Sequence, residues 1–480
     1  MLRPALFVAT LFALLPGAAW GSGLDIPDLG AAELASGSTG AASPTDATAL
    51  TYNPAGLAQQ KGFRALIDLR AVQEKLTFQR LNADGSNEDG WLPVSNAGGP
   101  TIAPMFGLSY ALTRLPVPFT IALGGHPASG YTGLAFPDPL AIYPRDDSGS
   151  YRKGGTYAGE VAREAPQRYS LISNDSLVYT FDLGVAVCLM RKLDLGVTFR
   201  GQYAHFVSKQ AIYGNPNTAG ENAGWDADLA VDATSAFTPS ATLGASYALP
   251  FGLAVGASFE LPSDIHAHGT MTLTNGPALT VAKATQKGNQ ADLVVKFPWI
   301  ARAGLKLSRP AFDLELDFTY DAWSRYDAIE LDPHDVSIVS DSGTTKVQPS
   351  RLVKGLQDAQ SLRFGGVFRP GTLASALSFL TVRAGVLGET SAVPSSYTAL
   401  DQANWERLSA SVGLGFALGG YQLVVAYAHF FQPDRQVRDS AVQQSAPNLP
   451  AADVSIVGNG DYHAQIDVAD VSLSGAWGQY

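Results

Sequence analysis

The chain has 480 residues, of which 16% are charged, and its formal net charge is -11. Soluble proteins usually carry about 25% charged residues, and nucleic-acid binding calls for a basic surface that this acidic chain lacks. The single cysteine, Cys188, excludes an internal disulfide and matches no cysteine spacing of a metal or redox site. The composition therefore argues against a nucleic-acid partner and against an ordinary soluble domain.

The N-terminus has the three-part layout of a secretory signal peptide. Arg3 precedes an apolar run at residues 5–15, and a Pro-Gly pair and small residues follow it. We expect residues 1–21 to be removed after export, with cleavage after Ala19 or Gly21. An exported chain without a later apolar run of spanning length is either soluble outside the inner membrane or a β-barrel in the outer membrane.

Small side chains dominate the next segment. Sixteen of the twenty residues from Gly30 to Ala49 are Ala, Gly, Ser or Thr, too few large side chains for a core of its own. The segment is either a flexible linker or a plug that packs closely inside a larger structure. Asn53, Pro54, Ala55 and Gly56 have turn chemistry that fixes where it ends.

From Gly62 onward, apolar and polar residues alternate in segment after segment, as in strands whose two faces meet different environments. Residues 312–326 place aromatic and aliphatic side chains on even positions and acids on odd ones. We count about fourteen such strands. Their centres lie near Ile67, Leu108, Ile121, Leu183, Val197, Leu243, Val255, Ala303, Leu316, Phe364, Val382, Val412, Val425 and Val471.

Short turns alternate with long polar loops, such as residues 82–99, 332–351 and 432–463. This asymmetry and the aromatic residues near strand ends are typical of a transmembrane barrel, whereas a large soluble sandwich would share only the alternation. The sequence thus predicts an all-β protein, a 14-stranded antiparallel transmembrane β-barrel formed by residues 62–480. Such a barrel is too wide to fill with its own side chains. We therefore expect residues 22–61 to form an N-terminal hatch inside the lumen.

Several blocks resemble one family. They are ALTYNPAG at residues 49–56, AWSRY at 322–326, SLRFGG at 361–366 leading to TVRAGVLGETSAVP at 381–394, and WERLSASV at 405–412 leading to AYAH at 426–429. In this order they resemble the FadL/TodX transporters of Gram-negative outer membranes. The resemblance implies a fourteen-stranded monomeric barrel with a hatch. We expect no cofactor and no catalytic activity, because the sequence carries no catalytic motif. The resemblance also implies passive uptake of long-chain fatty acids or aromatic hydrocarbons that leave through the barrel wall into outer-membrane lipid.

The third predicted strand carries Gly124, Gly125, Pro127 and Gly130. Proline cannot donate to a ladder and paired glycines weaken a strand, so pairing should fail here. Either the strand simply ends, or the break is a lateral opening, which the resemblance favours. We expect the hatch turn, Asn53 to Gly56, to face this break and to gate it.

Ligand contacts are less well defined by the sequence. The lumen-facing parity supplies Arg200, Arg302, Arg363 and Arg383, most of which we expect to be paired with lumen acids. Loop residues such as Phe136 and Tyr143 are candidates for shielding an apolar ligand. No catalytic motif is present, and His266 and His268 lack an evident third metal ligand. The rival interpretation is a structural or adhesive barrel that presents its long loops to a partner.

Overall fold

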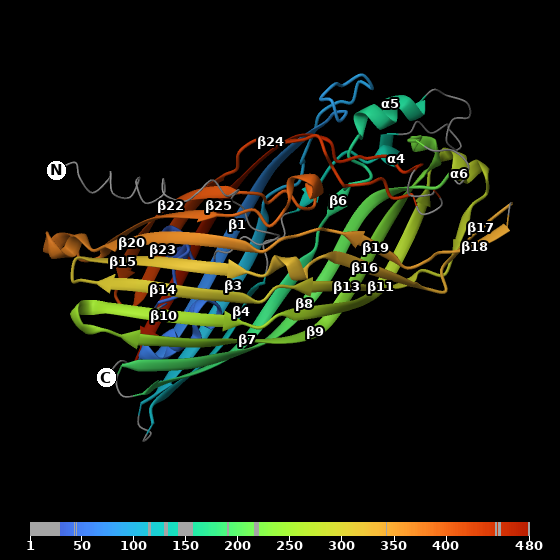
Figure 1. The fold of residues 1–480 in the computed structure, drawn as a ribbon. Helices are drawn as coiled ribbons and strands as arrows, with labels where there is room; N and C mark the ends of the chain where they lie inside the picture. Colours follow the sequence, from blue (N-terminus) through green and yellow to red (C-terminus); the bar gives the residue numbers. More distant parts are fainter. Residues whose placement is uncertain are drawn as a thin grey trace.

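The computed structural model describes residues 29–42, 44, 46–113, 117–128, 133–142, 157–189, 192–215, 220–341, 343–446, 449 and 453–478. They form a closed antiparallel β-barrel of 14 strands with the N-terminal segment inside it (Figure 1), which confirms the predicted fold class. The expected signal peptide lies outside these residues and stays a prediction. None of the helices in these ranges has the length and apolarity needed to cross a bilayer.

Some barrel strands are interrupted and therefore carry two labels. In order around the barrel they are β1 (Phe63–Arg80), β3 (Thr101–Leu112), β4 (Phe119–Pro127), β7 (Leu177–Leu189), β8 (Leu193–Tyr213), β9 (Asp226–Ala248), β10 (Leu253–Glu260) with β11 (Ser263–Asn275), β14 (Ile300–Ser308) with β13 (Gln290–Phe297), β15 (Phe312–Asp321) with β16 (Ala328–His334), β20 (Ala359–Phe368) with β19 (Ser350–Val353), β21 (Leu380–Glu389), β22 (Arg407–Leu418), β23 (Tyr421–Phe431) and β25 (Gly460–Trp477). Each predicted centre lies in a different one of these strands. Pairing of β1 with β25, from Phe63↔Trp477 to Arg80↔Gly460, closes the ring.

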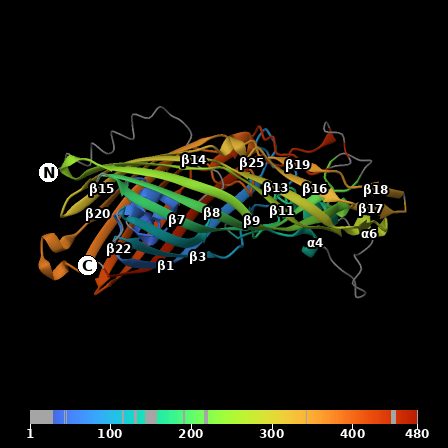
Figure 2. The same cartoon turned by 90° about the horizontal axis from the view of Figure 1, so that it is seen from below.

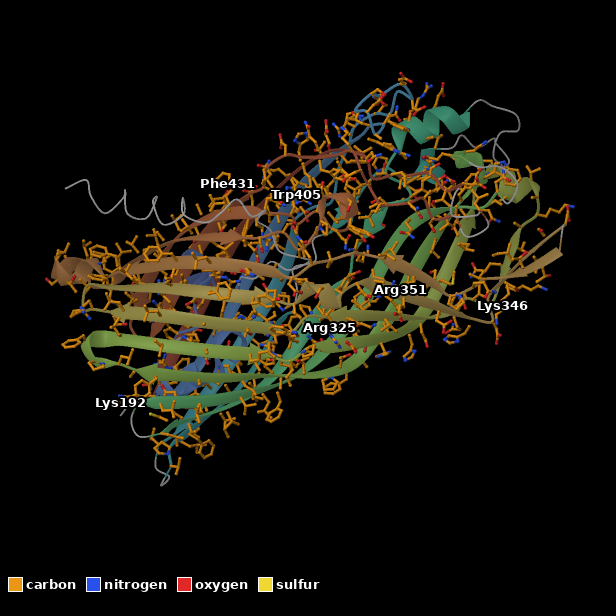
Figure 3. All side chains as sticks on the ribbon, viewed as in Figure 1. Lys192, Arg325, Lys346, Arg351, Trp405 and Phe431 are labelled. Atoms are coloured by element: carbon orange, nitrogen blue, oxygen red, sulfur yellow. The ribbon has the colours of Figure 1, made fainter. Side chains whose placement is uncertain are left out.

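The two ends of the barrel differ. One, here called the turn end, carries short connections and the C-terminus; the other, the loop end, carries long connections (Figure 1). The loop end includes α4 (Pro139–Ile142), α5 (Tyr157–Glu164), α6 (Pro277–Val281) and a small sheet of β12 (Thr285–Lys287), β17 (Ser337–Ser340) and β18 (Gly343–Lys346). Figure 3 marks the turn end by Lys192 and the loop end by Lys346.

Apolar side chains cover the outside of the turn-end half. Ile67 is 66% exposed, Phe199 57% and Phe318 43%, an arrangement that suits contact with lipid tails rather than water. Aromatic rings gather at both edges of this band, with Phe63 against Trp477 at one edge and Trp299 stacked on Tyr320 at the other. These are the two girdles expected at membrane interfaces.

Halfway along several neighbouring strands, the inward and outward faces exchange. In β9, Leu229 and Val231 are buried inside, whereas Leu243, of the same parity, is 51% exposed outside. A register shift of β8 between Gln202 and Ala204 inserts the extra β9 residue that causes the exchange. Prolines stand at or near this level in the strands that exchange: Pro239 in β9, Pro262 between β10 and β11, and Pro298 between β13 and β14. As a result the lumen is polar in the turn-end half and apolar in the loop-end half.

The hatch fills the turn-end half of the lumen (Figure 2). It contains α2 (Ala31–Ala35), α3 (Ala49–Tyr52) and the 3-10 helix η1 (Pro54–Gln59). A belt of inward-facing glycines receives it, and at each of them an added Cβ would lie within 2.8 Å of a hatch atom. The belt comprises Gly107, Gly124, Gly184, Gly196, Gly244, Gly256, Gly304, Gly365, Gly385 and Gly413. Small residues on both partners thus bring hatch and wall into backbone contact.

Candidate functional site

Wall carboxylates anchor the hatch backbone. Asp317 Oδ2 accepts hydrogen bonds from the amides of Gly40 and Ala41 at 2.7 and 2.9 Å, and Glu315 Oε1 accepts one from Ala42 at 2.9 Å. All three amides belong to a stretch without regular secondary structure, so they have no helical or strand partner of their own. The acids therefore satisfy donors that the hatch cannot satisfy itself.

The predicted hatch turn is a buried junction between the hatch and the wall. The Asn53 side-chain oxygen accepts a hydrogen bond from the Ala55 amide at 3.1 Å. Its Nδ2 donates to the carbonyl oxygens of Ala41 in the hatch at 2.6 Å and Ala245 in β9 at 3.1 Å. One side chain thereby joins two segments of the hatch to each other and to the barrel wall.

Strand β4 leaves one neighbour before the other. Its ladder with β3 ends at Phe106↔Gly125, whereas its ladder with β7 continues to Pro127↔Tyr179. The first five residues of β3, 101–105, all pair with β1 but have no partner in β4. The expected loss of pairing at this glycine-proline segment is therefore one-sided, and it separates β3 from β4 only.

A tyrosine reaches across this separation from outside. The Tyr179 hydroxyl, on β7, donates a hydrogen bond to the Pro104 carbonyl of β3 at 3.1 Å. Gly125 makes room for it, because a Cβ there would lie 2.5 Å from the ring of Phe106 and 3.1 Å from that of Tyr179. The Tyr179 side chain thus makes one hydrogen bond to β3 at a level where β4 makes none.

A cavity of about 360 Å³ occupies the separation and reaches both sides of the wall. Its outer lining includes Ile102 and Leu177, which are 55% and 44% exposed on the barrel exterior. Its inner lining includes Arg200, Glu260 and Arg302, which point into the lumen. We call it the side cavity.

The hatch touches the side cavity directly. Thr51 Oγ1 lies 3.0 Å from His126 Nε2, which also lies 3.0 Å from Asp182 Oδ2. Arg200 donates to the Leu50 carbonyl at 3.2 Å and contacts Asp182 at 3.4 Å. One network therefore joins α3 of the hatch to the end of β4.

The predicted arginines are distributed over three places. Arg200 and Arg302 meet at Glu260, with nitrogen–oxygen distances of 2.5 and 3.2 Å. Arg363 holds the hatch by donating to the Ser38 carbonyl at 3.1 Å. Arg383 lines a separate cavity of about 630 Å³ at the turn end.

The predicted loop contacts are not brought together. Phe136 is buried in a cluster with Leu134, Leu171 and Trp405 and lines none of the cavities described here. Tyr143 lies outside the described residues, as does Gly130 of the third strand.

A third cavity, which the sequence did not reveal, lies in the loop-end half. We call it the upper chamber; its volume is about 210 Å³. Its apolar lining comprises Leu171, Phe206, Leu229, Val231, Leu293, Val295, Tyr326, Ile329, Leu331 and Leu352. Leu229, Val231, Leu293 and Val295 face inward only because the faces of their strands exchange between the lower and the upper lumen. The signal that could have revealed the chamber is the set of mid-strand prolines at 239, 262 and 298.

Histidines form no metal centre within the described residues, where no group of three potential ligand side chains is suitably placed. His268 and His334 instead each contact Asp292, at 2.7 and 2.9 Å, on the outer surface of the loop-end half. This contact accounts for His268 as an ordinary surface residue that hydrogen-bonds a carboxylate.

Solved structures share the fold at low sequence identity. A Pseudomonas aeruginosa FadL homologue matches with a TM-score of 0.69 and 13% identity over 95% of this chain and 100% of that one. The Pseudomonas putida toluene transporter TodX gives 0.62 and 15% over 95% and 99%, and the Ralstonia pickettii toluene transporter TbuX gives 0.60 and 14% over 94% and 99%. No curated protein sequence matches the chain.

The sequence itself matches the family described as outer membrane protein transport protein (OMPP1/FadL/TodX) over residues 161–465. This match covers more than half of the chain. It agrees with the closed barrel, its apolar outer band and its internal hatch, and it confirms the resemblance drawn from the sequence blocks. The chain belongs to the OMPP1/FadL/TodX family and is a transport channel of the outer membrane, not an enzyme.

Proposed function

We propose that this channel takes up hydrophobic small molecules passively and releases them sideways into the outer membrane between β3 and β4. Short turns of outer-membrane barrels face the periplasm, so the loop end is the capture side. The single observation that carries the proposal is the side cavity, which connects the lumen with the exterior where β4 leaves β3. The matched structures include two toluene transporters and a FadL homologue, which agrees with a hydrophobic cargo.

The proposed path begins in the upper chamber. Its aliphatic and aromatic lining offers an apolar ligand a lower free energy than water does. Below it the hatch closes the straight route, since α2, α3 and η1 contact the wall through the glycine belt. We call the separation between β3 and β4, which the side cavity occupies, the gap. A ligand that turns sideways through it meets Ile102 and Leu177 and then lipid tails. It therefore avoids crossing water.

The hatch turn acts as the gate in this proposal. Asn53 holds the turn against Ala245, and Thr51, two residues earlier, contacts His126 at the gap. A small displacement of this turn would break the Thr51 contact and move the inner lining of the side cavity. Hatch position and gap width are thus coupled through one short segment.

We propose that the channel works as a monomer in contact with outer-membrane lipid. The continuous pairing of β1 with β25 closes the ring, so neither the first nor the last strand offers an edge that would need a partner. The rival function, an adhesive barrel that displays its loops, needs neither the side cavity nor the upper chamber.

Closing the gap covalently tests the proposal. Continuing the β3–β4 register beyond Phe106↔Gly125 pairs Ala103 with Ala128, and both line the side cavity. In a Cys188→Ala background, cysteines at these two positions joined by a short reducible cross-linker should abolish uptake of a labelled hydrocarbon by cells, and reduction should restore it. Each single-cysteine variant, treated identically, is the matched control.

Two outcomes would contradict the proposal. If the cross-linked protein transports at the wild-type rate, the lateral route is wrong. If the wild-type protein in lipid nanodiscs binds neither a hydrocarbon nor a fatty acid, the adhesive barrel replaces the transporter.

A further inference from the structure

The charges that line the transport path are paired. In the side cavity, Arg200 contacts both Glu260 and Asp182, Arg302 contacts Glu260, and Arg70 contacts Asp470 at 3.1 Å. His126, which also lines this cavity, contacts Asp182. Each cation of the side cavity thus already has a carboxylate partner.

The upper chamber repeats this arrangement. Lys209 lies 2.6 Å from Asp138 and 2.8 Å from Asp228. The other two cations that line the chamber are Arg351, paired with Asp327, and Lys354, paired with Asp401. From the chamber to the gap, a ligand meets apolar side chains and compensated ion pairs.

From this pairing we infer that the cargo of this channel is an uncharged, compact hydrocarbon and that the path discriminates against carboxylates. The inference rests on the proposed transport function and narrows its substrate class. A carboxylate that enters a passage lined mainly by apolar surface loses hydration and needs a cation in return. Here it would have to displace a protein carboxylate that is tethered beside that cation. A neutral molecule meets no such competition.

The size of the upper chamber points the same way. Its volume of about 210 Å³ exceeds the roughly 150 Å³ of an engineered cavity lined by Leu, Ile and Phe that binds benzene. A single substituted aromatic ring therefore fits, whereas a long acyl chain would have to extend beyond the chamber.

Glu260 is the residue on which this discrimination depends most. Its two oxygens divide between two arginines, with Oε1 contacting Arg200 and Oε2 contacting Arg302 at 3.2 and 3.3 Å. Arg200 retains Asp182 and the Leu50 carbonyl if Glu260 is neutralised. Arg302 would lose its charged partner while still facing the side cavity. Neutralising Glu260 should therefore create the carboxylate site that the wild-type channel lacks.

The experiment compares p-xylene with p-toluate, which replaces one methyl group by a carboxylate, and includes oleate. Binding of each radiolabelled compound to protein in nanodiscs is measured against empty nanodiscs. The wild-type protein should bind p-xylene at least about tenfold more tightly than p-toluate. The Glu260→Gln variant should bind p-toluate and oleate at least about tenfold more tightly than the wild type does, as expected for one new hydrogen bond to a charged group. Glu406→Gln, at an ion pair with Arg435 away from both cavities, should change neither affinity.

A second variant keeps the inference testable if Glu260→Gln does not fold. Arg302→Met removes a cation but leaves Glu260 paired with Arg200, so p-xylene binding should be unchanged. The inference is overturned if wild-type protein binds p-toluate or oleate as tightly as p-xylene, or if Arg302→Met selectively abolishes carboxylate binding. These results would leave the transport function standing, whereas binding of none of the three compounds would remove the transport function itself.

Discussion

Replacing Gly365 by alanine should displace the hatch without disturbing the barrel. Gly365 lies in β20 on the lumen side, and a Cβ there would lie 1.8 Å from the Ser36 carbonyl oxygen of the hatch. Ordinary contact begins at 3.4 Å, so the hatch must retreat by about 1.6 Å. That movement stretches two 3.1 Å hydrogen bonds, from the Gly37 amide to Ser411 and from Arg363 to the Ser38 carbonyl.

Overpacking of this kind typically costs about 1–3 kcal/mol, and a shift of that size changes a two-state population about 5- to 150-fold. The clash lies between hatch and wall, so it destabilises the seated position of the hatch. We therefore expect the population of channels with a displaced hatch to increase by this factor. In planar bilayers it should appear as more frequent ion-conducting openings, since the hatch is what closes the lower lumen. Folding of the barrel should be unaffected, as measured on gels by its resistance to unfolding in detergent.

The adjacent glycine supplies the control. Gly366 faces outward, where the nearest atom to an added Cβ is a Leu314 methyl at 3.3 Å. Gly366→Ala should therefore conduct like the wild type. Equal conductance of the Gly365→Ala and Gly366→Ala variants would refute the view that the glycine belt holds the hatch in place.

Further predictions concern the gap between β3 and β4, the contact between Thr51 and His126, and the loop end. Tyr179→Phe removes the hydroxyl that bridges to Pro104 and should accelerate hydrocarbon uptake by cells severalfold; an unchanged rate would show that this contact does not restrain the gap. Thr51→Val removes the hydrogen bond to His126, worth about 0.5–1.5 kcal/mol, and should increase deuterium exchange of the β4 end, whereas Thr77→Val, on the outer surface of β1, should not. Burial alone would raise the pKa of Glu221, but the hydrogen bond and charge of Arg80 outweigh it and lower that pKa below the ordinary 4.5. A carboxyl group with a lowered pKa stabilises the folded state above its unfolded pKa and loses this contribution as pH falls through the folded pKa. The loop end should therefore resist proteolysis down to mildly acidic pH and become susceptible only below about pH 4.5, and Glu221→Gln should make it susceptible already at neutral pH.

Alternation predicted the fourteen strands, because each predicted centre, from Ile67 to Val471, depends on a local two-residue period. The choice of a barrel over a sandwich also needed the asymmetry of the loops and the aromatic residues near strand ends. The small residues between Gly30 and Gly56 left a linker and a plug open, and the width of the predicted barrel favoured the plug. The surface of the wall against which this segment packs could not be predicted in the same way. Glycines at positions such as 107, 244 and 385 face one belt only after strands far apart in the sequence are set in register.

The upper chamber shows a different limit. Leu229, Val231, Leu243 and Tyr247 share odd parity, so the sequence of β9 alternates without interruption. The inserted residue near Pro239 nevertheless turns the first two inward and the last two outward. Periodicity gives the pattern of a strand but not the point at which a bulge reverses its faces.

The gap and the reversal of faces lie on one register line, which explains why release would occur at this level. Pro127 of β4 pairs with Tyr179 of β7, which pairs with Tyr203 of β8, and Tyr203 is the residue at the register shift against β9. A ligand that descends the apolar upper half therefore meets the polar, hatch-filled lumen at the same level as the opening between β3 and β4. If the ligand continued downward, its apolar surface would leave apolar contacts, which costs about 25 cal/mol of free energy for each Å² exposed. Turning sideways preserves these contacts. Straightening β9 by deleting Phe237 should turn Leu229 and Val231 out of the upper chamber and abolish uptake even with the gap intact, because the cargo would lose part of its apolar path to the opening.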